Sequence, residues 1–412
     1  MNRQELISKF TEVFGAGEPP VCVFSPGRVN LIGEHTDYNG GHVFPCALTI
    51  GTYFAARKRE DRKVRFYSGN FPGDGIIERS LDALSFDAAK GFSNYLMGMI
   101  WAYGERLHLT VERGMDVYLF GNIPNASGLS SSASVEVGMG KVLNLLFGVN
   151  VPNLEIAKTG QFSENHYNGL SSGIMDQFAI AMGKKDMAMF LDTATLEFEY
   201  APIALQGMRI VVICTNKKRS LVDSKYNERC RECAEALADL KRVTDIEALG
   251  NLTGEAFEQY KYAIKNETNL RRARHAVYEN VRTVKAVEAL KNGDIEGFGK
   301  LMNASHVSLR DDYEVTGAEL DTIAETAWTV PGCVGARMTG AGFGGCAVAI
   351  VREEAIDAFI ETVGKKYLEK IGYAADFYVV EIGDGADEMK DCGTFPQTEA
   401  GKNGMQKFMK SV

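Results

Sequence analysis

The sequence lacks the features of several classes of protein. No run of about 18 apolar residues occurs among its 412 residues, so no membrane-spanning helix is expected. It has no low-complexity tract and no linker rich in proline and serine, and it contains only 10 prolines. Basic residues are not in excess, because 45 lysines and arginines against 54 aspartates and glutamates give a net charge of −9. A surface of this sign repels nucleic acids and anionic membranes, so we expect neither as a partner.

The eight cysteines do not have the spacing of a disulfide scaffold. They lie mostly in apolar stretches of a long chain, which favours reduced thiols and a cytoplasmic location. Cys230 and Cys233 form a single C-x-x-C in a helical stretch, with no second pair to complete a zinc site. The first 17 residues indicate an amphipathic helix without a cleavage signal, so we expect no targeting segment there.

The composition is that of a folded protein with a large core. Hydrophobic residues make up 45% and charged residues 24% of a length that favours two or three domains. Predicted strands are separated by glycine-rich turns in the first half, whereas residues 222–329 are almost wholly helical in pattern, and strands return near 346–351 and 376–382. Because strands and helices do not alternate strictly, we predict an α+β fold with largely antiparallel sheets. We place a boundary near residue 205, giving domains 1–205 and 206–412 with the active site in the cleft between them.

Residues 26–42, PGRVNLIGEHTDYNGGH, are unusually rich in polar groups directly after a predicted strand. Carboxylates and an imidazole on a short loop suit a ligand with several hydroxyl groups, because charged acceptors bind hydroxyls strongly. The alternative is a solvated hairpin, since Asn39-Gly40 is a strong turn signal.

Residues 123–134, IPNASGLSSSAS, form a turn rich in glycine and serine that opens a predicted helix. Free backbone N–H groups and the positive end of the helix dipole attract phosphate there, and serine hydroxyls bind phosphate oxygen or Mg²⁺. An ordinary serine N-cap is the alternative. The P-loop of other nucleotide-binding proteins is excluded, because no lysine follows the glycine.

Residues 335–346, GARMTGAGFGGC, place five glycines ahead of an apolar strand. Such a segment allows close approach of backbone to backbone or ligand, with a hairpin or bulge as the alternative. Asp176 and Glu164 are two further acids of interest, although each read alone is more typical of a helix surface.

Taken together and in this order, the segments resemble the GHMP small-molecule kinases, and residues 26–42 resemble the galactokinase branch of that family. The match extends over most of the chain, through GRVNLIGEHTDYNGG, PNASGLSSSA, GIMDQF and GARMTGAGFGG. The resemblance implies the two-domain α+β fold of the family, with ATP and Mg²⁺ bound together with the sugar.

The resemblance also implies roles for individual residues. Asp176 and Arg28 are the implied catalytic residues. Mg²⁺ ligands are implied at Ser132 and Glu164, and a weaker nucleotide contact at Ser68. The implied sugar-binding residues are Glu34, His35, Thr36, Asp37, Gly173 and Tyr226. The implied phosphate loop comprises Ala126, Ser127, Gly128, Leu129, Ser130, Ser131 and Ser132. Ala126 stands where the family usually has glycine, so we expect at most a higher KM for ATP. Kinetics of Ala126→Gly would test this expectation.

The expected activity is therefore phosphorylation of the C1 hydroxyl of α-D-galactose by ATP, the first phosphorylation of the Leloir pathway. A kinase for N-acetylgalactosamine or another hexose is an alternative, and so is a sugar sensor on the same scaffold that binds ATP and galactose without turnover. A monomer is expected.

Overall fold

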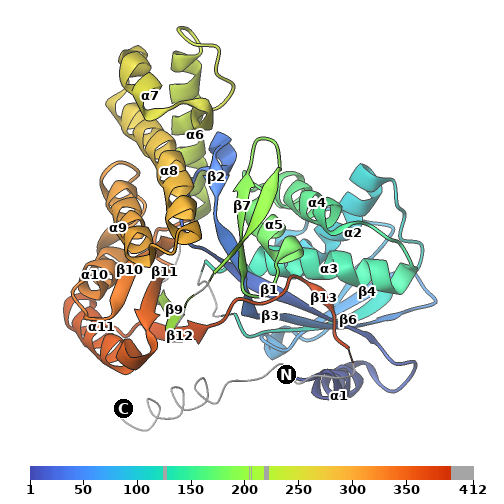
Figure 1. Ribbon diagram of the computed structural model, residues 1–412. Helices are drawn as coiled ribbons and strands as arrows, with labels where there is room; N and C mark the ends of the chain where they lie inside the picture. The colour runs from blue at the N-terminus through green and yellow to red at the C-terminus, as the bar shows by residue number, and fades with distance from the viewer. Residues whose placement is uncertain (124–127, 204, 206, 218–221, 391–412) are drawn as a thin grey trace.

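The structure is a computed structural model that describes residues 1–123, 128–203, 205, 207–217 and 222–390. Over these residues, no helix combines the length and the apolar character needed to cross a membrane. The strands form three sheets flanked by helices (Figure 1). The strands are β1 (Val21–Asn30), β2 (His42–Val43), β3 (Pro45–Lys58), β4 (Lys63–Ser68), β5 (Ile77–Ser80), β6 (Met115–Gly121), β7 (Met187–Asp192), β8 (Phe198–Pro202), β9 (Met208–Cys214), β10 (Cys333–Thr339), β11 (Cys346–Arg352), β12 (Asp376–Val380) and β13 (Asp387–Glu388).

The helices cover these sheets and also form an arm that extends from them. The helices are α1 (Arg3–Phe14), α2 (Ser93–Leu107), α3 (Ser131–Phe147), α4 (Asn153–His166), α5 (Met175–Met182), α6 (Val222–Leu240), α7 (Gly254–Tyr260), α8 (Glu267–Lys291), α9 (Ile295–Asp311), α10 (Gly317–Ala327) and α11 (Ile356–Ile371).

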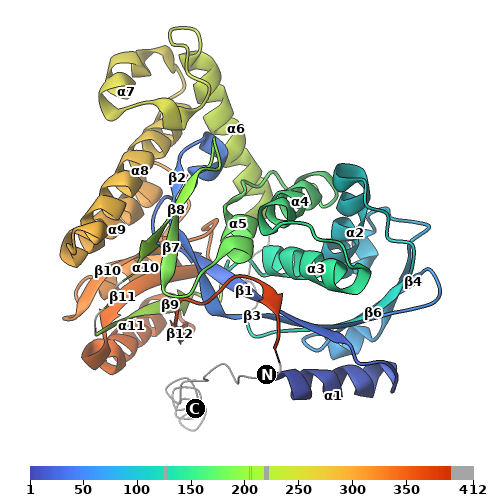
Figure 2. The ribbon, with the colours of Figure 1, turned by 45° about the vertical axis from the view of Figure 1, so that its right-hand side comes forward.

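The first sheet has six strands in the order β13-β1-β3-β6-β4-β5. Helices α2, α3 and α4 cover one face and α1 lies on the other (Figure 2). The main core forms on the helical side, where Phe54 of β3 and Val117 of β6 are buried with side chains of α2 and α3. A three-stranded sheet, β2-β7-β8, packs against α5 nearby.

The second large sheet has the order β10-β11-β9-β12. Its central strands, β9 and β11, consist almost entirely of apolar residues. Its alternating side chains bury both faces: Val211 and Ala349 pack with α10 and α11, whereas Val212 and Val348 pack with α9 and with Val29 of β1. This second face therefore joins the two halves of the chain. Helices α6, α7 and the start of α8 extend away from both sheets as an arm (Figure 1).

Most of the predicted fold is confirmed. Every strand pair among the described residues is antiparallel except β4 with β6. The helical character of 222–329 is confirmed for the described residues, which form α6 to α10. Residues 335–346 form a hairpin, because β10 and β11 pair across the glycine-rich turn. Residues 333–339 are not among the predicted strands, because most of them belong to the segment whose glycines indicate a turn. The boundary near residue 205 stays a prediction.

One expectation about the cysteines is wrong. Cys214 of β9 and Cys346 of β11 lie directly opposite each other, with their Cα atoms 4.2 Å apart, and they form a disulfide. The 132 residues between them in the chain conceal this proximity, which arises only when β9 and β11 become neighbours in the sheet.

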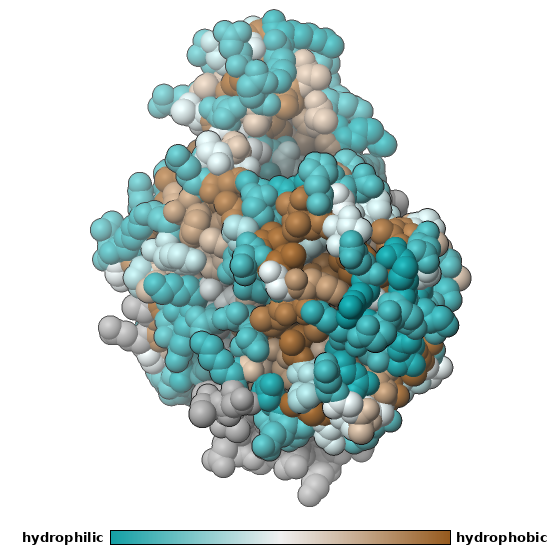
Figure 3. Space-filling model, turned by 90° about the vertical axis from the view of Figure 1, so that its right-hand side faces the viewer, coloured by the Kyte–Doolittle hydropathy of each residue, from teal (hydrophilic) through white to brown (hydrophobic). Residues whose placement is uncertain are grey.

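The surface over the helical side of the first sheet is mixed in character. Hydrophobic side chains form a band between polar ones on this face (Figure 3). Two phenylalanine side chains are exposed among the described residues: Phe71, after β4, is 46% exposed and stacks on Phe92, and Phe86, before α2, is 50% exposed and packs edge-on against Tyr167.

Candidate active site

The three segments singled out in the sequence converge in the structure. The N–H of Arg28 donates to the carbonyl oxygen of Leu129 at 3.3 Å, which joins the first segment to the second. The glycine-rich turn after β10 lies against both, because a Cβ on Gly340 would be 2.8 Å from the carbonyl oxygen of Gly128 and the N–H of Gly340 donates to Glu34 Oε1. The predicted convergence on one site is thus confirmed.

Arg28 and Asp176 form an ion pair at the centre of this site. Nε and Nη2 of Arg28 each lie 2.7 Å from Asp176 Oδ1, and Nη1 donates to the carbonyl oxygen of Gly128 at 2.8 Å. The hydroxyl of Ser130 donates to the other carboxylate oxygen, Oδ2. The side chain of Arg28 is 4% exposed and that of Asp176 is 30% exposed, so only the carboxylate faces the open site.

The start of α3 is not an ordinary serine cap. Ser130 occupies the N-cap position with φ 60° and ψ 51°, a left-handed conformation that is uncommon for serine, and its side chain accepts no hydrogen bond from the helix. Its hydroxyl is used on Asp176 instead. The free N–H groups at this helix start therefore remain for a ligand. Ala126 and Ser127 of the predicted phosphate loop lie outside the described residues.

The loop that follows β1 is buried, which rules out the solvated hairpin. Residues 29–36 are all buried. Asp37 opens a short 3-10 helix, and its carboxylate lies against Gly173, where a Cβ would overlap it. The ring of Tyr226 on α6 lies 5.7 Å from that of His35. The predicted sugar-binding residues Asp37, Gly173, Tyr226 and His35 are therefore brought together from three separate parts of the chain.

Burial controls the charge of two of these side chains. It raises the pKa of Asp37 to about 7, with a further contribution from the negative charge of Asp176. It lowers the pKa of His35 to about 3, so the imidazole is neutral near pH 7. His35 Nδ1 pairs with the hydroxyl of Tyr38 at 2.8 Å, and its Nε2 has no hydrogen-bond partner among the described residues.

Glu34 is held by groups from both halves of the chain. Its Oε2 accepts from Nδ2 of Asn30 at 2.7 Å and lies 2.9 Å from Nη2 of Arg337 on β10. Both charged side chains of this pair are almost fully buried, at 0% exposure for Arg337 and 1% for Glu34. Such a buried pair contributes little net stability but is costly to break.

Glu279 of α8 supports the backbone of the same loop. Its Oε1 accepts from the N–H of Gly33 at 3.1 Å and from that of Glu34 at 3.3 Å. Burial alone would raise the pKa of Glu279, but the charges of Arg282 and Arg337 help to lower it to about 2, so it is ionised. Glu279 and Arg337 are supporting residues that the sequence analysis did not assign. Arg337 lay inside the third segment, whereas nothing in the local sequence marked Glu279.

Two predicted site residues have other contacts. The hydroxyl of Thr36 donates to the carbonyl oxygens of Gly33 at 2.9 Å and His42 at 2.7 Å, which supports the loop, and its role in sugar binding stays a prediction. Ser68 is buried at the end of β4, and its hydroxyl accepts from the N–H of Asn70 at 3.2 Å. Among the described residues, the hydroxyl of Ser68 forms no hydrogen bond with another of these site residues.

A second group of carboxylates lies beside Asp176. Glu164 of α4 is buried, and its Oε1 accepts from the hydroxyl of Ser132 at 3.1 Å. Glu136 of α3 is fully buried, and burial raises its pKa well above the ordinary range, with a further contribution from Glu164. Nε2 of Gln177 donates to both acids, at 3.0 Å to Glu136 and 2.7 Å to Glu164. Glu164 is therefore not the surface acid that its local sequence alone suggests, and the sequence analysis did not assign Glu136 or Gln177.

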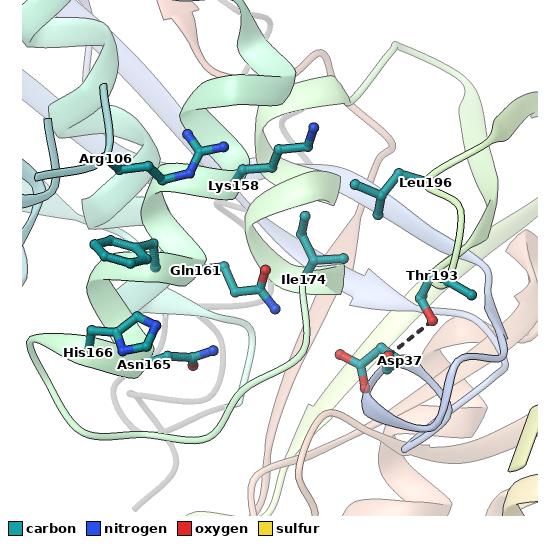
Figure 4. A pocket seen from close by; sticks show the side chains of 11 residues that line it. Asp37, Arg106, Lys158, Gln161, Asn165, His166, Ile174, Thr193 and Leu196 are labelled. Atoms are coloured by element: carbon teal, nitrogen blue, oxygen red, sulfur yellow. Dashed lines mark hydrogen bonds between the residues drawn. The ribbon is translucent and has the colours of Figure 1, made fainter. Parts of the chain in front are cut away.

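An open cavity of about 430 Å³ borders the sugar-binding side of the site. Figure 4 shows Asp37 and Thr193 at one end, and Arg106 and Lys158 at the other, with Gln161 between them. Both basic side chains pair with the same acid, because Glu155 lies 2.7 Å from Arg106 and 3.1 Å from Lys158. The cavity is therefore polar and is bordered by charges of both signs.

Comparison with known proteins identifies the family. Profiles described as "GHMP kinases N terminal domain" and "GHMP kinases C terminal" match residues 94–184 and 286–370, and a "Galactokinase galactose-binding signature" matches residues 8–58. The solved mevalonate kinase of Methanococcus jannaschii has the same fold, with a TM-score of 0.65 at 19% identity over 90% of this chain and all of that one. The fold is therefore that of a GHMP kinase.

Closer relatives narrow the assignment. A galactokinase of Ligilactobacillus salivarius is 56% identical over 93% of this chain and 99% of its own length, and one of Streptococcus suis is 54% identical over 94% and 98%. The crystal structure of Lactococcus lactis galactokinase complexed with galactose matches with a TM-score of 0.92 at 51% identity, covering 93% of this chain and 99% of that one. The chain belongs to the galactokinase family and is an enzyme that uses ATP as its co-substrate.

Proposed function

We propose that this chain transfers the γ-phosphoryl group of ATP to the C1 hydroxyl of α-D-galactose, giving galactose 1-phosphate and ADP. The observation that carries the proposal is the position of Asp176, which contacts Arg28 and Ser130 at the start of α3. The sugar loop with Asp37 and Gly173 lies beside this group. One carboxylate thus stands between a loop suited to hydroxyls and a helix start suited to phosphate.

Asp176 and Arg28 act on the reacting atoms. Asp176 orients the C1 hydroxyl and accepts its proton as the new O–P bond forms and the bond from the γ-phosphorus to the β-γ bridging oxygen breaks, releasing ADP. Arg28, held by Asp176 and by the carbonyl of Gly128, contributes fixed positive charge next to the transferring group. Alignment and charge stabilisation supply most of the rate in reactions of this class.

The sugar-binding side combines charged and neutral groups. Asp37 accepts hydroxyl hydrogen bonds, and Gly173 leaves room for its carboxylate. Nε2 of His35, buried and without a partner among the described residues, is available to another hydroxyl. Tyr226 closes the pocket from α6, and Glu34 retains lone pairs for the sugar beyond those used by Asn30, Arg337 and Gly340.

The phosphates of ATP are proposed to bind at the start of α3. Backbone N–H groups there and the helix dipole favour negative charge, and Arg28 is the nearby cation. The proposed contacts run along the segment that leads into α3. They comprise Ala126, Ser127, Gly128, Leu129, Ser130, Ser131 and Ser132, with Ser68 as a weaker contact.

Ser132 and Glu164 are proposed to hold Mg²⁺. Glu164 is buried, and among the described residues no lysine, arginine or histidine forms an ion pair with Glu164 or with neighbouring Glu136. Oε1 of Glu136 has no hydrogen-bond partner there either. A buried pair of carboxyl groups without a cation fits a divalent ion with oxygen ligands, because the charge of the ion would favour their ionised form. When bound, the ion would neutralise phosphate charge.

The two alternatives predict different results in one experiment. Release of ADP would be measured with galactose, N-acetylgalactosamine, glucose, mevalonate and homoserine, each with and without Mg²⁺. We expect turnover with galactose that requires Mg²⁺. Preference for N-acetylgalactosamine or glucose would support the other hexose kinases, whereas binding of galactose and ATP without turnover would support a sensor.

We also propose that the monomer is the functional unit and that the enzyme is cytoplasmic. Light scattering of the purified protein at micromolar concentration tests whether it is a monomer.

A further inference from the structure

We propose that Gln177 is a positioning residue for phosphoryl transfer: its side-chain amide holds Glu164 in place and couples the metal side of the site to Asp176. The inference rests on the proposed role of Glu164 as a Mg²⁺ ligand. It assigns a function to a residue that contacts neither the sugar nor the phosphates in the arrangement proposed above.

The Gln177 amide joins three helices. Gln177 lies on α5, fully buried, and its Nε2 donates to Glu164 of α4 at 2.7 Å and to Glu136 of α3 at 3.0 Å. An amide nitrogen carries two hydrogens, so this group is fully used by the two carboxylates. Hydrogen bonds to charged acceptors are about twice as strong as those between neutral groups.

The two carboxylate oxygens of Glu164 have different hydrogen-bond partners. Oε2 accepts from Nε2 of Gln177 at 2.7 Å and from the hydroxyl of Ser172 at 2.9 Å. Oε1 has a single described partner, the hydroxyl of Ser132 at 3.1 Å. Gln177 and Ser172 together therefore fix the carboxylate by one oxygen and leave the other facing the proposed metal position at the start of α3. Outer contacts of this kind orient metal-ligating carboxylates.

The neighbouring residue on the same helix is Asp176. Side chains of consecutive helical residues point in directions about 100° apart, so one turn of α5 presents Asp176 to Arg28 and Ser130 and presents Gln177 to α3 and α4. The position of the metal ligand relative to the catalytic carboxylate is thereby set by one rigid element. Such placement on a helix is more accurate than placement on a loop.

Stability alone does not account for this glutamine. Its Oε1 is buried and has no hydrogen-bond partner among the described residues, and Oε1 of Glu136 is in the same state. A buried polar atom without a partner lowers the stability of the folded protein. A methionine of similar volume would fill the space without that cost, so the amide is explained by what it holds.

The test is Gln177→Met, with Mn²⁺ as a paramagnetic probe of metal binding in the presence of ADP. We expect Mn²⁺ affinity to fall about tenfold, kcat to fall at least tenfold, and the Kd for galactose to change less than twofold. Unchanged Mn²⁺ affinity in the folded variant would overturn the proposal. If Gln177→Met does not fold, Gln177→Asn retains the amide but shortens its reach, and the same loss of Mn²⁺ affinity is expected.

Two further variants separate the possible causes. Asn144→Leu removes an amide of α3 that donates to the carbonyl oxygen of Val151 at 2.9 Å, and it should lower stability without changing Mn²⁺ affinity. Glu164→Ala should abolish strong Mn²⁺ binding. If Glu164→Ala has no effect, the proposed metal ligand is wrong; if only Gln177→Met has no effect, the metal ligand stands and the positioning role fails.

Discussion

Asp176 has both carboxylate oxygens occupied by donors, Arg28 on Oδ1 and Ser130 on Oδ2, yet its side chain remains 30% exposed. This combination of fixed orientation and access suits a group that receives a proton from a bound substrate. It also explains why Asp176 follows an apolar stretch of sequence without being part of the core.

Replacing Asp176 with asparagine should therefore separate chemistry from binding. We expect Asp176→Asn to reduce kcat at least ~10²-fold, because the proton acceptor is lost, while galactose binding measured by calorimetry is retained. Asp357→Asn, at an exposed aspartate in the first turn of α11, is the matched control and should leave kcat unchanged. Near-normal turnover of Asp176→Asn would remove Asp176 from the proposed catalytic role.

Asp37 predicts a pH dependence of sugar binding. Its pKa is raised to about 7 by burial and by Asp176, so the free protein carries a proton there below pH 7. Sugar hydroxyls bind the ionised carboxylate better, so binding should release a proton. We expect galactose affinity to weaken by up to about tenfold for each pH unit below 7.

Calorimetry in buffers of different ionisation enthalpy would measure the released proton. Asp37→Asn should show weak binding that is independent of pH. His35 is not expected to contribute between pH 5 and 8, because its pKa is about 3. An affinity for galactose that stays constant from pH 5.5 to 8 in the unaltered protein would contradict the prediction.

At the scale of elements, α3 connects the proposed site to the fold. Its N-terminus is the proposed phosphate-binding position, and the helix packs directly on the first sheet. Gly138 lies on its buried face, where a Cβ would come within 2.7 Å of the Phe54 ring atom Cζ on β3 and nearer still to Cε2. The absence of a side chain therefore lets helix and sheet approach closely. This distance sets where the helix start lies relative to β1.

Gly138→Ala should be destabilising by about 1–2 kcal/mol, because overpacking of the core exceeds the gain in helix propensity. Gly104→Ala in α2 is the control, since a Cβ there meets nothing within 4 Å, and it should be neutral or slightly stabilising. Midpoints of chemical denaturation would compare the two. Equal midpoints would show that α3 shifts to accommodate the methyl group.

At the scale of the whole molecule, a buried charge links the two halves of the chain. Arg337 of β10 lies 2.9 Å from Glu34 and donates from Nη1 to the carbonyl oxygen of Asn30 at 3.0 Å. The sugar loop is thus positioned by a sheet more than 300 residues away in the sequence.

Arg337→Met should lower the free energy of unfolding by about 3–5 kcal/mol, because it leaves Glu34 and Glu279 buried without their shared cation. Arg310→Met is the control, because Arg310 pairs with Asp311 and Glu325 at the surface, where such pairs contribute about 0–1 kcal/mol. Denaturation midpoints distinguish the two. A similar small loss for both variants would mean that the buried pair does not hold the halves together.

The local sequence was enough to select candidate site residues that lie within recognisable motifs. Arg28, Asp37 and Ser130 lie in polar or glycine-rich segments and Asp176 lies in GIMDQF, and the structure brings these segments together. Glu279 could not be found this way, because it lies in an ordinary helical pattern of α8 and becomes a support only when α8 packs beside the sugar loop.

The amino-acid order alone determined most of the strands, the helical run and the family, because periodicity and motifs are properties of neighbours along the chain. Tertiary structure alone decided which side chains from distant parts of the sequence are buried against one another. Examples are the Glu34–Arg337 pair, the Gln177 bridge between two acids and the Cys214–Cys346 disulfide. The physical reason is that desolvation and charge pairing depend on distances across the fold, which separation along the chain does not encode.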